Sequence, residues 1–400
     1  MVTNRQQRDL DIVLFGATGF TGTLTAEYLA AHAPAGTRWG LAGRNRSKLE
    51  GLRERLGIDV AILQTDTTDP RSVRDLAGAA RVVATTVGPY MRYGLPLAAA
   101  CAEAGTDYLD LAGETEFVDT VYLRHQATAE RSGARLVHAC GFDSIPHDLG
   151  ALYTVEQLPA DRPIRMSGYV SGGGLPSGGT FDSTVTIMSR MRPANALHAQ
   201  RQRAEPDLQG RRVRAVTGLP GHDRTAGGWV LPLPTIDPQI VVRSAAALER
   251  YGPDFTYSHF AAAANPLVAA GLTAGAAGTF ALAQFPPSRQ LLRRLRPPGS
   301  GPSAAQRAKG WFRVRFIAEA GGAAANAGSE DGARRVVTEV AGGDPGYGET
   351  SKMLAESALC LACDALPETA GQVTTAVAMG DVLRERLERA GISFRVIEKR

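Results

Sequence analysis

The sequence contains few cysteines, and they form no cluster. Only four of its 400 residues are cysteine, namely Cys101, Cys140, Cys360 and Cys363. Thiols in alanine- and leucine-rich segments are typical of small buried side chains in a reducing compartment, so we expect a cytoplasmic protein. Cys360 and Cys363 have the C-x-x-C spacing, but no second pair of Cys or His accompanies them. We therefore expect neither a redox centre nor a metal site.

A strong excess of charge of one sign is also absent. The chain carries 44 basic and 40 acidic side chains, which gives a formal net charge of +4. This mild basicity comes without a basic tail or an aromatic-interleaved patch, so the sequence predicts no nucleic-acid partner. Residues 1–9 are polar and lack the apolar segment of a secretion signal.

One long stretch, residues 261–285, lacks charge altogether. Its length would permit a membrane span. Because Pro266 and several glycines interrupt it, the sequence favours a pair of buried helices instead. The alternative is a peripheral membrane contact through residues 261–296, or a contact with an acidic carrier domain. That alternative rests on the arginines that follow the stretch, Arg289, Arg293, Arg294 and Arg296.

The first 150 residues alternate short apolar runs with helical stretches, the pattern of βαβ units. Helices are expected between successive strands, on both faces of one parallel sheet. The expected strands are residues 11–16, 37–42, 60–64, 81–87, 108–111 and 135–139. The fold class is therefore α/β, with a Rossmann-type doubly wound parallel sheet in residues 1–150.

After Gly150 the pattern changes to that of an inserted α+β domain with a mixed sheet, over residues 151–345. Strands are expected at 164–171, 229–233 and 311–320, and 334–340 is expected to pair antiparallel with the last of these across a turn at 321–332. The charged stretch 201–214 is expected to form a loop. Helices at 351–366 and 376–390 and a strand at 393–397 follow, and residues 346–400 are expected to return and complete the first domain.

A glycine motif follows the first strand. Gly16, Gly19 and Gly22 have the spacing G-x-x-G-x-x-G, and Thr18, Phe20 and Thr21 complete the loop. The first glycine allows a tight turn, the second lets the backbone approach a pyrophosphate, and the third lets helix and strand pack closely. The start of the next helix supplies free N–H groups to the phosphates. This context predicts a dinucleotide site.

The end of the second strand indicates which dinucleotide is bound. An NAD enzyme places Asp or Glu there, whereas this chain has Arg44, which favours the 2′-phosphate of NADP. Asn45 and Lys48 are expected beside it, and Asp66 is a candidate contact for the adenine edge. A solvated basic loop is the alternative interpretation.

Two further strand ends are expected to line the nicotinamide, because ligands bind beyond the carboxyl ends of parallel strands. The first carries Val87, Gly88 and Pro89, and the second carries Gly141 and Phe142.

These same strand ends supply three candidate proton donors, Tyr90, Asp143 and His147. Each has a plainer alternative. Tyr90 would only stack on the cofactor, Asp143 would cap a turn, and His147 would be an ordinary residue of a helix's first turn.

Several segments together resemble a known family. The segments are Gly-Ala-Thr-Gly-Phe-Thr-Gly at 16–22, Ala-Gly-Arg at 42–44, Val-Gly-Pro-Tyr at 87–90 and Cys-Gly-Phe-Asp-Ser-Ile-Pro at 140–146. They resemble the saccharopine dehydrogenase-like oxidoreductases. Gly-Trp-Phe at 310–312, Asp-Pro-Gly-Tyr at 344–347 and Ala-Met-Gly-Asp at 378–381 are closest to its actinobacterial branch, the trans-acting enoyl reductases. The chain departs from that branch at 374–376, where Thr-Thr-Ala replaces a Thr-Pro-Ala-type sequence.

The resemblance implies NADPH-linked reduction of an activated double bond in an acyl chain, delivered by a partner polyketide synthase. Two alternatives stay open: an imine reductase of the saccharopine dehydrogenase type, and a lipid-surface protein that binds a nucleotide without turnover. Homodimerisation is a general expectation for a soluble enzyme.

Overall fold

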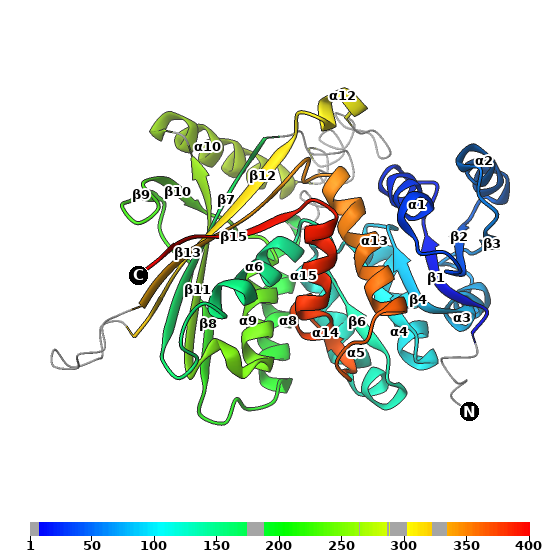
Figure 1. The fold of residues 1–400 in the computed structure, drawn as a ribbon, viewed down its shortest axis with the longest axis horizontal. Coiled ribbons are helices and arrows are strands. Elements are labelled where there is room, and N and C mark those ends of the chain that lie inside the picture. Colours follow the sequence, from blue (N-terminus) through cyan, green and yellow to red (C-terminus); the bar gives the residue numbers. More distant parts are fainter. Residues whose placement is uncertain (1–7, 174–187, 264, 286–287, 289–301, 322–333) are drawn as a thin grey trace.

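The computed structural model describes residues 8–173, 188–263, 265–285, 288, 302–321 and 334–400. Two sheets dominate it: a parallel sheet near the N-terminus, drawn in blue and cyan, and a mixed sheet that carries the C-terminus (Figure 1). The expected α/β class with a second mixed sheet is confirmed.

The first sheet has seven strands in the order β14-β6-β5-β4-β1-β2-β3, and all its neighbours pair in parallel. The central residues Ile12–Phe15 are buried on both faces, as expected for a parallel sheet between helix layers. The strands are β1 (Leu10–Phe15), β2 (Trp39–Gly43), β3 (Ala61–Gln64), β4 (Ala80–Thr85), β5 (Asp107–Leu109), β6 (Arg135–Val137) and β14 (Gly371–Val373).

Helices cover both faces of this sheet. Leu14 and its neighbours pack beneath α1 (Phe20–His32) and α13 (Gly348–Cys363), and Val13 belongs to the core on the other face. That second core lies beneath α3 (Pro70–Ala79), α4 (Tyr90–Ala104) and α5 (Thr115–Ser132). Helix α2 spans Arg46–Leu56, because Asn45 caps its start and Gly57 ends it in the left-handed conformation.

The second sheet has the order β15-β13-β12-β7-β11-β10-β9, with β8 paired to β11. It is mixed because β11 pairs in parallel with β7 and β8, while the other neighbours are antiparallel. The expected antiparallel pairing of 311–320 with 334–340 is confirmed, for example between Phe316 and Thr338. Most of the expected turn at 321–332 lies outside the described residues. The strands are β7 (Ile164–Gly173), β8 (Arg212–Ala215), β9 (Gly221–Asp223), β10 (Gly228–Pro232), β11 (Asp254–Ala263), β12 (Trp311–Ala320), β13 (Arg334–Gly342) and β15 (Ser393–Lys399).

The prediction of a loop at 201–214 holds only for residues 205–211 and is wrong at both ends. Helix α8 (Met191–Ala204) includes Arg201, and β8 begins at Arg212. Arg201 is only 3% exposed because its guanidinium pairs with the buried carboxylate of Asp119 on α5. The start of this charged segment therefore forms a helix, because Asp119 of the first domain neutralises Arg201.

The C-terminal segment divides between the two sheets. Strand β14 joins β6 in the first sheet, and α13 packs on α1. The expected single helix at 376–390 is two helices, α14 (Thr375–Ala378) and α15 (Gly380–Arg389), broken where Gly380 has φ +47°. The last strand, β15, pairs with β13 in the second sheet, so it does not return to the first domain as expected. Its Phe394 is buried against Tyr153, which fixes this position.

Helix α6 (Ile145–Val155) connects the two sheets through the middle of the molecule (Figure 1). It follows β6 directly and packs against β12 and β13. Ten of its eleven residues are buried, because α9 (Asp237–Ala247) and α15 cover its remaining sides. The first turn of α6 therefore lies where the dinucleotide domain meets the second sheet.

The apolar stretch forms one exposed helix, α10 (Pro266–Ala283), which packs along β10 and β11. Leu267 is 83% exposed and Phe280 is 42% exposed. The prediction of a pair of buried helices is therefore wrong, because hydropathy records composition and not what covers a face. In the described residues, α10 is the one helix whose length and composition would suffice to cross a membrane.

Candidate active site

A tight loop joins β1 to α1 at the carboxyl edge of the first sheet. Gly16 has φ +87°, which only glycine adopts readily. A Cβ on Gly22 would lie 2.1 Å from the carbonyl oxygen of Gly16, so this close approach also requires glycine. The Gly19 N–H closes the turn by donating to that same oxygen at 2.9 Å.

Helix α1 begins at Phe20 without a side-chain cap, because its N-cap residue is Gly19. The first N–H groups of a helix, here including those of Thr21 and Gly22, have no partner within the helix. Thr18 and Gly19 are exposed in front of them. The loop thus presents free N–H groups and a positive helix end, which fit the pyrophosphate of a dinucleotide.

The rim beyond β2 carries two exposed cations, Arg44 and Lys48. Asn45 has a local role, since its Oδ1 accepts a hydrogen bond from the Lys48 N–H at 3.0 Å. Hydrogen bonds from Thr68 lower the pKa of the Asp66 carboxyl, and Arg44 lowers it further. Arg44 and Lys48 are therefore the side chains of this rim that fit a 2′-phosphate.

The loop after β4 packs against the glycine loop. A Cβ on Gly16 would lie 2.7 Å from Val87 Cγ2. Gly88 is exposed at this edge, and Pro89 immediately precedes α4. These contacts place the segment beside the dinucleotide loop, where the sequence predicts the nicotinamide side of the site.

Tyr90 is buried beneath this edge rather than presented to it. Its hydroxyl donates to the Thr85 carbonyl at 3.2 Å and accepts from the Leu111 N–H at 3.1 Å. Both oxygens of Glu114 accept hydrogen bonds at 2.8 Å from the first N–H groups of α4, those of Tyr90 and Met91. Because its hydroxyl joins two strand ends, Tyr90 is better suited to positioning than to proton donation.

The loop after β6 lies between the two domains. A Cβ on Gly141 would lie 2.8 Å from the Leu111 side chain, which explains the glycine. The Phe142 N–H donates to Thr350 Oγ1 on α13 at 3.1 Å. The Phe142 ring contacts Phe312 of the second sheet and the ring of His147, with centroids 5.0 and 5.4 Å apart.

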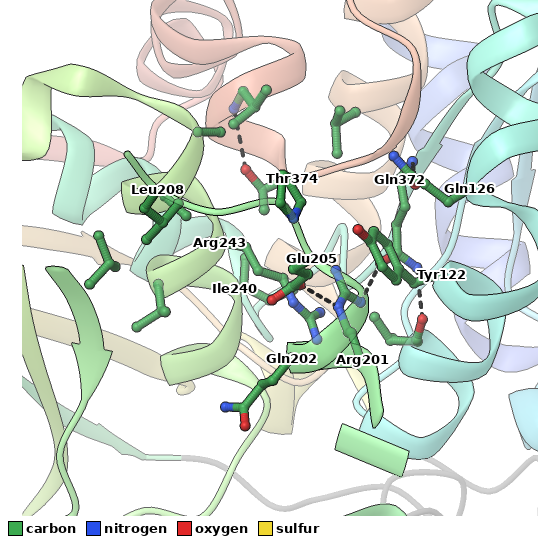
Figure 2. Close-up of a pocket in the computed structure, with 18 of the residues that line it drawn as sticks. Tyr122, Gln126, Arg201, Gln202, Glu205, Leu208, Ile240, Arg243, Gln372 and Thr374 are labelled. Atoms are coloured by element: carbon green, nitrogen blue, oxygen red, sulfur yellow. Dashed lines mark hydrogen bonds and ion pairs between the residues drawn. The ribbon is translucent and has the colours of Figure 1, made fainter. Parts of the chain in front are cut away.

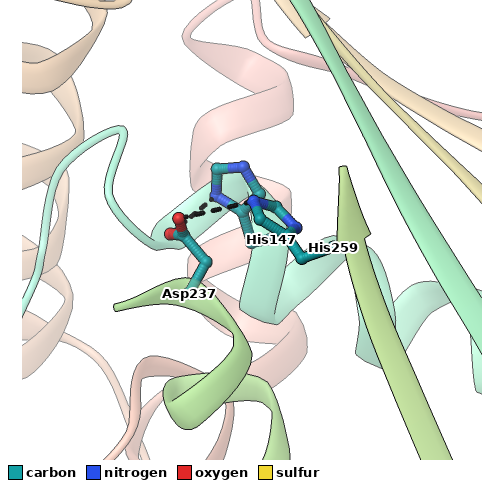
Figure 3. Close-up of side chains that lie close together, drawn as sticks. All are labelled: His147, Asp237 and His259. Carbon is teal, nitrogen blue, oxygen red and sulfur yellow. Dashed lines mark ion pairs between the residues drawn. The ribbon is translucent and has the colours of Figure 1, made fainter. Parts of the chain in front are cut away.

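Three buried side chains meet beside this loop: His147 from α6, Asp237 from α9 and His259 from β11 (Figure 3). Asp237 Oδ1 lies 3.2 Å from His147 Nδ1, and Asp237 Oδ2 lies 3.6 Å from His259 Nε2. The second nitrogen of His259 contacts the Tyr257 hydroxyl at 3.0 Å. The ligand atoms of the three residues lie within 4.8 Å of one another, so the cluster is also compact enough for a divalent metal ion.

Burial decides the charge state of this cluster. Burial lowers the pKa of His147, and it lowers that of His259 to about 4, although the Asp237 charge opposes both shifts. Burial alone would raise the pKa of Asp237, but the two histidines outweigh it and hold that pKa below its ordinary value. At neutral pH the cluster therefore contains one carboxylate and two neutral imidazoles.

Asp143 lies at the end of the same loop and points toward the loop after β5. Its Oδ2 is 3.8 Å from the position that a Cβ on Gly113 would occupy. Asp143 is exposed to solvent, although protein atoms crowd its carboxyl group. This partial desolvation, together with the charge of Asp237, raises the pKa of the Asp143 carboxyl. Asp143 thus holds a proton at a higher pH than an ordinary aspartate.

Sequence reasoning found His147 and Asp143 but missed Asp237, His259 and Glu114. Asp237 and His259 have no motif around them in the sequence, and they reach the site only through the packing of α9 and β11. Ser144 stands at the N-cap position of α6 but makes no capping hydrogen bond, and it helps to lower the pKa of Asp237.

Comparison with known proteins agrees with this geometry. Residues 12–137 match the NADP-binding domain of saccharopine dehydrogenase. The chain is 38% identical to a trans-acting enoyl reductase of Mycobacterium tuberculosis, over 96% of this chain and 97% of the relative. It is also 40% identical, over 97% of each chain, to a second protein of Mycobacterium tuberculosis, which is named a putative trans-acting enoyl reductase. It is 36% identical to a trans-acting enoyl reductase of Mycobacterium ulcerans, over 96% and 97%.

The fold has a counterpart among solved structures. Saccharopine dehydrogenase (L-Glu forming) of Saccharomyces cerevisiae superposes with a TM-score of 0.54 at 10% sequence identity, over 97% of this chain and all of that one. At this identity the likeness concerns the fold alone. The near full-length matches above identify the chain as a member of the trans-acting enoyl reductase family, NADP-dependent oxidoreductases with a saccharopine dehydrogenase-like dinucleotide domain.

Proposed function

We propose that this protein is an NADPH-dependent enoyl reductase that saturates the C=C bond of an acyl thioester. The observation that carries the proposal is the acid Asp143, which follows β6, points toward the loop after β5 and has its pKa raised by partial desolvation and by the Asp237 charge. An enoyl reduction needs such a proton donor beside the hydride acceptor. The names of the near full-length relatives support the same reaction class.

The chain's own residues bind, orient and protonate. NADPH, when bound, supplies the hydride that adds to the β-carbon. The Asp143 carboxyl then gives its proton to the α-carbon of the resulting enolate, so that one hydride and one proton add across the double bond. The ionised Asp237 favours the protonated form of Asp143, while the contact between the Phe142 and Phe312 rings holds the loop after β6 against the second sheet.

The reaction is tested by following NADPH oxidation with a 2-enoyl thioester such as a crotonyl thioester. We expect saturable oxidation with the enoyl substrate and none with its saturated analogue. A cyclic imine is the matched probe for the alternative reductase, and we expect no oxidation with it. Oxidation by the imine alone, or background rates with both substrates, would contradict the proposal.

We further propose that the acyl substrate arrives on a partner synthase in the cytoplasm. This rests on the "trans-acting" name of the relatives and on the mild positive charge of the chain, which favours association with an acidic carrier domain. In the same assay, a carrier-bound enoyl chain is expected to show a lower KM than the free thioester. Equal KM values would argue that the protein acts on free thioesters.

The exposure of α10 favours a second candidate function, contact with a lipid surface. Leu267 and Leu272 are 83% and 51% exposed on one helix that carries no charge. If this helix binds membranes, the protein floats with anionic vesicles, and replacing both leucines with glutamate abolishes flotation. Leu219→Glu, at a position 85% exposed in the segment between β8 and β9, is the matched control. A wild-type protein that stays in the soluble fraction would rule this function out.

A further inference from the structure

A cavity of about 800 Å³ lies between the two domains, at the carboxyl ends of β6 and β14. Helix α5 and β14 form its wall on the first domain, and α8, β8 and α9 form the wall on the second (Figure 2). Its volume is that of a typical small-molecule pocket. None of the residues of the glycine loop or of the His147 cluster lines it.

A buried ion-pair network forms the polar wall of this cavity. Arg201 Nη1 lies 3.2 Å from Asp119 Oδ1 and 2.5 Å from Gln372 Oε1, and its Nε lies 2.6 Å from Glu205 Oε1. Arg243 donates through Nη2 to the same oxygen of Asp119. One fully buried carboxylate is thus shared by two guanidinium groups.

This network leaves a donor without an acceptor. In the part of the chain that the structure describes, Arg243 Nη1 is buried and has no hydrogen-bond partner. His138 Nε2 is also buried without a partner there, but it is an acceptor in the neutral tautomer, because Nδ1 donates to Asp110 Oδ2 at 2.6 Å. Arg243 and His138 both line the cavity. A buried donor left unpaired is costly, so a ligand acceptor at Arg243 would remove that cost.

The electrostatics favour an acceptor that carries negative charge. Burial and the neighbouring Arg201 lower the pKa of Arg243 to about 10, although Asp119 and Glu205 oppose the shift. The cation is therefore incompletely neutralised by the protein. An anion within hydrogen-bonding distance of Nη1 would stabilise it, because charge-assisted hydrogen bonds are the stronger ones.

Part of the lining is apolar and limits the ligand further. Val118, Ile240, Val242 and Val377 contribute hydrocarbon to the cavity wall, and Ala246 lies about one helical turn beyond Val242. The charged side chains of the lining are mostly basic, because Arg211, Arg212 and Arg214 stand there beside Arg201 and Arg243, against the acids Glu205 and Asp207. The site therefore suits a molecule with a negatively charged head group and an apolar body.

We propose that this cavity binds a medium-chain carboxylate, with its head group on Arg243 and its hydrocarbon chain along Ile240 and Val242. The proposal is independent of the reaction proposed above, because the cavity shares no residue with the dinucleotide loop or with the cluster of His147, Asp237 and His259.

Calorimetric titration of the full-length protein with decanoate tests this site. We expect saturable one-to-one binding to the wild type. In Arg243→Gln the affinity falls at least tenfold, because the free donor and its charge are removed. In Ala246→Phe it also falls at least tenfold, because the ring fills the apolar part of the cavity while Arg243 is retained. Arg203→Gln, an exposed arginine of α8 outside the cavity, is the matched control and keeps wild-type affinity.

Ligand controls define the chemistry. Decanol lacks the charge and decylamine inverts it, so neither is expected to bind. NADPH affinity, measured in both cavity variants, shows whether they are folded. The proposal is overturned if the wild type does not bind decanoate, if both folded variants bind it as tightly as the wild type, or if decanol binds equally well.

Discussion

Asp143→Asn is expected to lower kcat for the enoyl substrate by roughly 100- to 10,000-fold, the usual contribution of a positioned general acid. Asparagine keeps the size and polarity of the side chain but has no proton to give to the enolate. The affinity for NADPH is expected to stay unchanged, because the phosphates meet the Gly16–Gly22 loop and Arg44 instead. Steady-state kinetics and a fluorescence titration with NADPH measure the two quantities separately.

The pH profile identifies the acid directly. Only the protonated carboxyl donates, so the wild-type kcat falls as pH rises through the raised pKa of Asp143. This fall should disappear in Asp143→Asn. In Asp237→Asn it should move to lower pH, because the charge that helps to raise the pKa of Asp143 is gone. A fall that persists unchanged in Asp143→Asn would assign the proton to another group.

His147→Ala separates proton donation from positioning. If His147 only holds Asp237 in place, its loss lowers kcat and shifts the pH profile, whereas NADPH affinity is kept. His222→Gln, an exposed histidine on β9, serves as the matched control. A chelator is expected to leave turnover unchanged. A loss of turnover on chelation would show that the cluster of His147, Asp237 and His259 holds a metal ion.

The first domain was predictable because its signals are local. A fully buried parallel strand is an uninterrupted apolar run such as Ile12–Phe15, and glycines mark where each strand ends. The second domain depends on distant partners. Arg201 is charged and therefore resembles a loop residue until Asp119 is found beside it, and β11 carries Tyr257 and His259 among its buried positions, which hides its strand pattern.

The site divides in the same way. The dinucleotide loop is one contiguous motif whose glycines have steric reasons that can be read from their spacing. The cluster of His147, Asp237 and His259 is assembled from three elements. Asp237 precedes a proline in the first turn of a helix, where an aspartate normally indicates only that a helix begins. Its role emerges only when α6, α9 and β11 pack together and bury its charge between two histidines.

Arg44→Ala is expected to weaken NADPH binding by roughly 10- to 150-fold, which corresponds to the loss of a charged hydrogen bond worth about 1.5–3 kcal/mol. NADH binding should change little, because NADH has no 2′-phosphate for the arginine to meet. Arg44 is exposed at the end of β2, so its removal leaves no buried group unpaired and the fold intact. Dissociation constants for both cofactors are measured by fluorescence titration.

A neighbouring arginine makes the comparison specific. Arg46 is two residues away but pairs with Glu50 at 2.9 Å within α2, so Arg46→Ala is expected to leave the preference for NADPH unchanged. Equal losses of NADPH and NADH affinity in Arg44→Ala would mean that the arginine acts through the shared parts of the cofactor. Lys48→Ala in the Arg44→Ala background then measures whether the second exposed cation of the rim carries the remaining preference for NADPH. We expect this preference to fall further, because Lys48 is the other exposed cation that we expect to contact the 2′-phosphate.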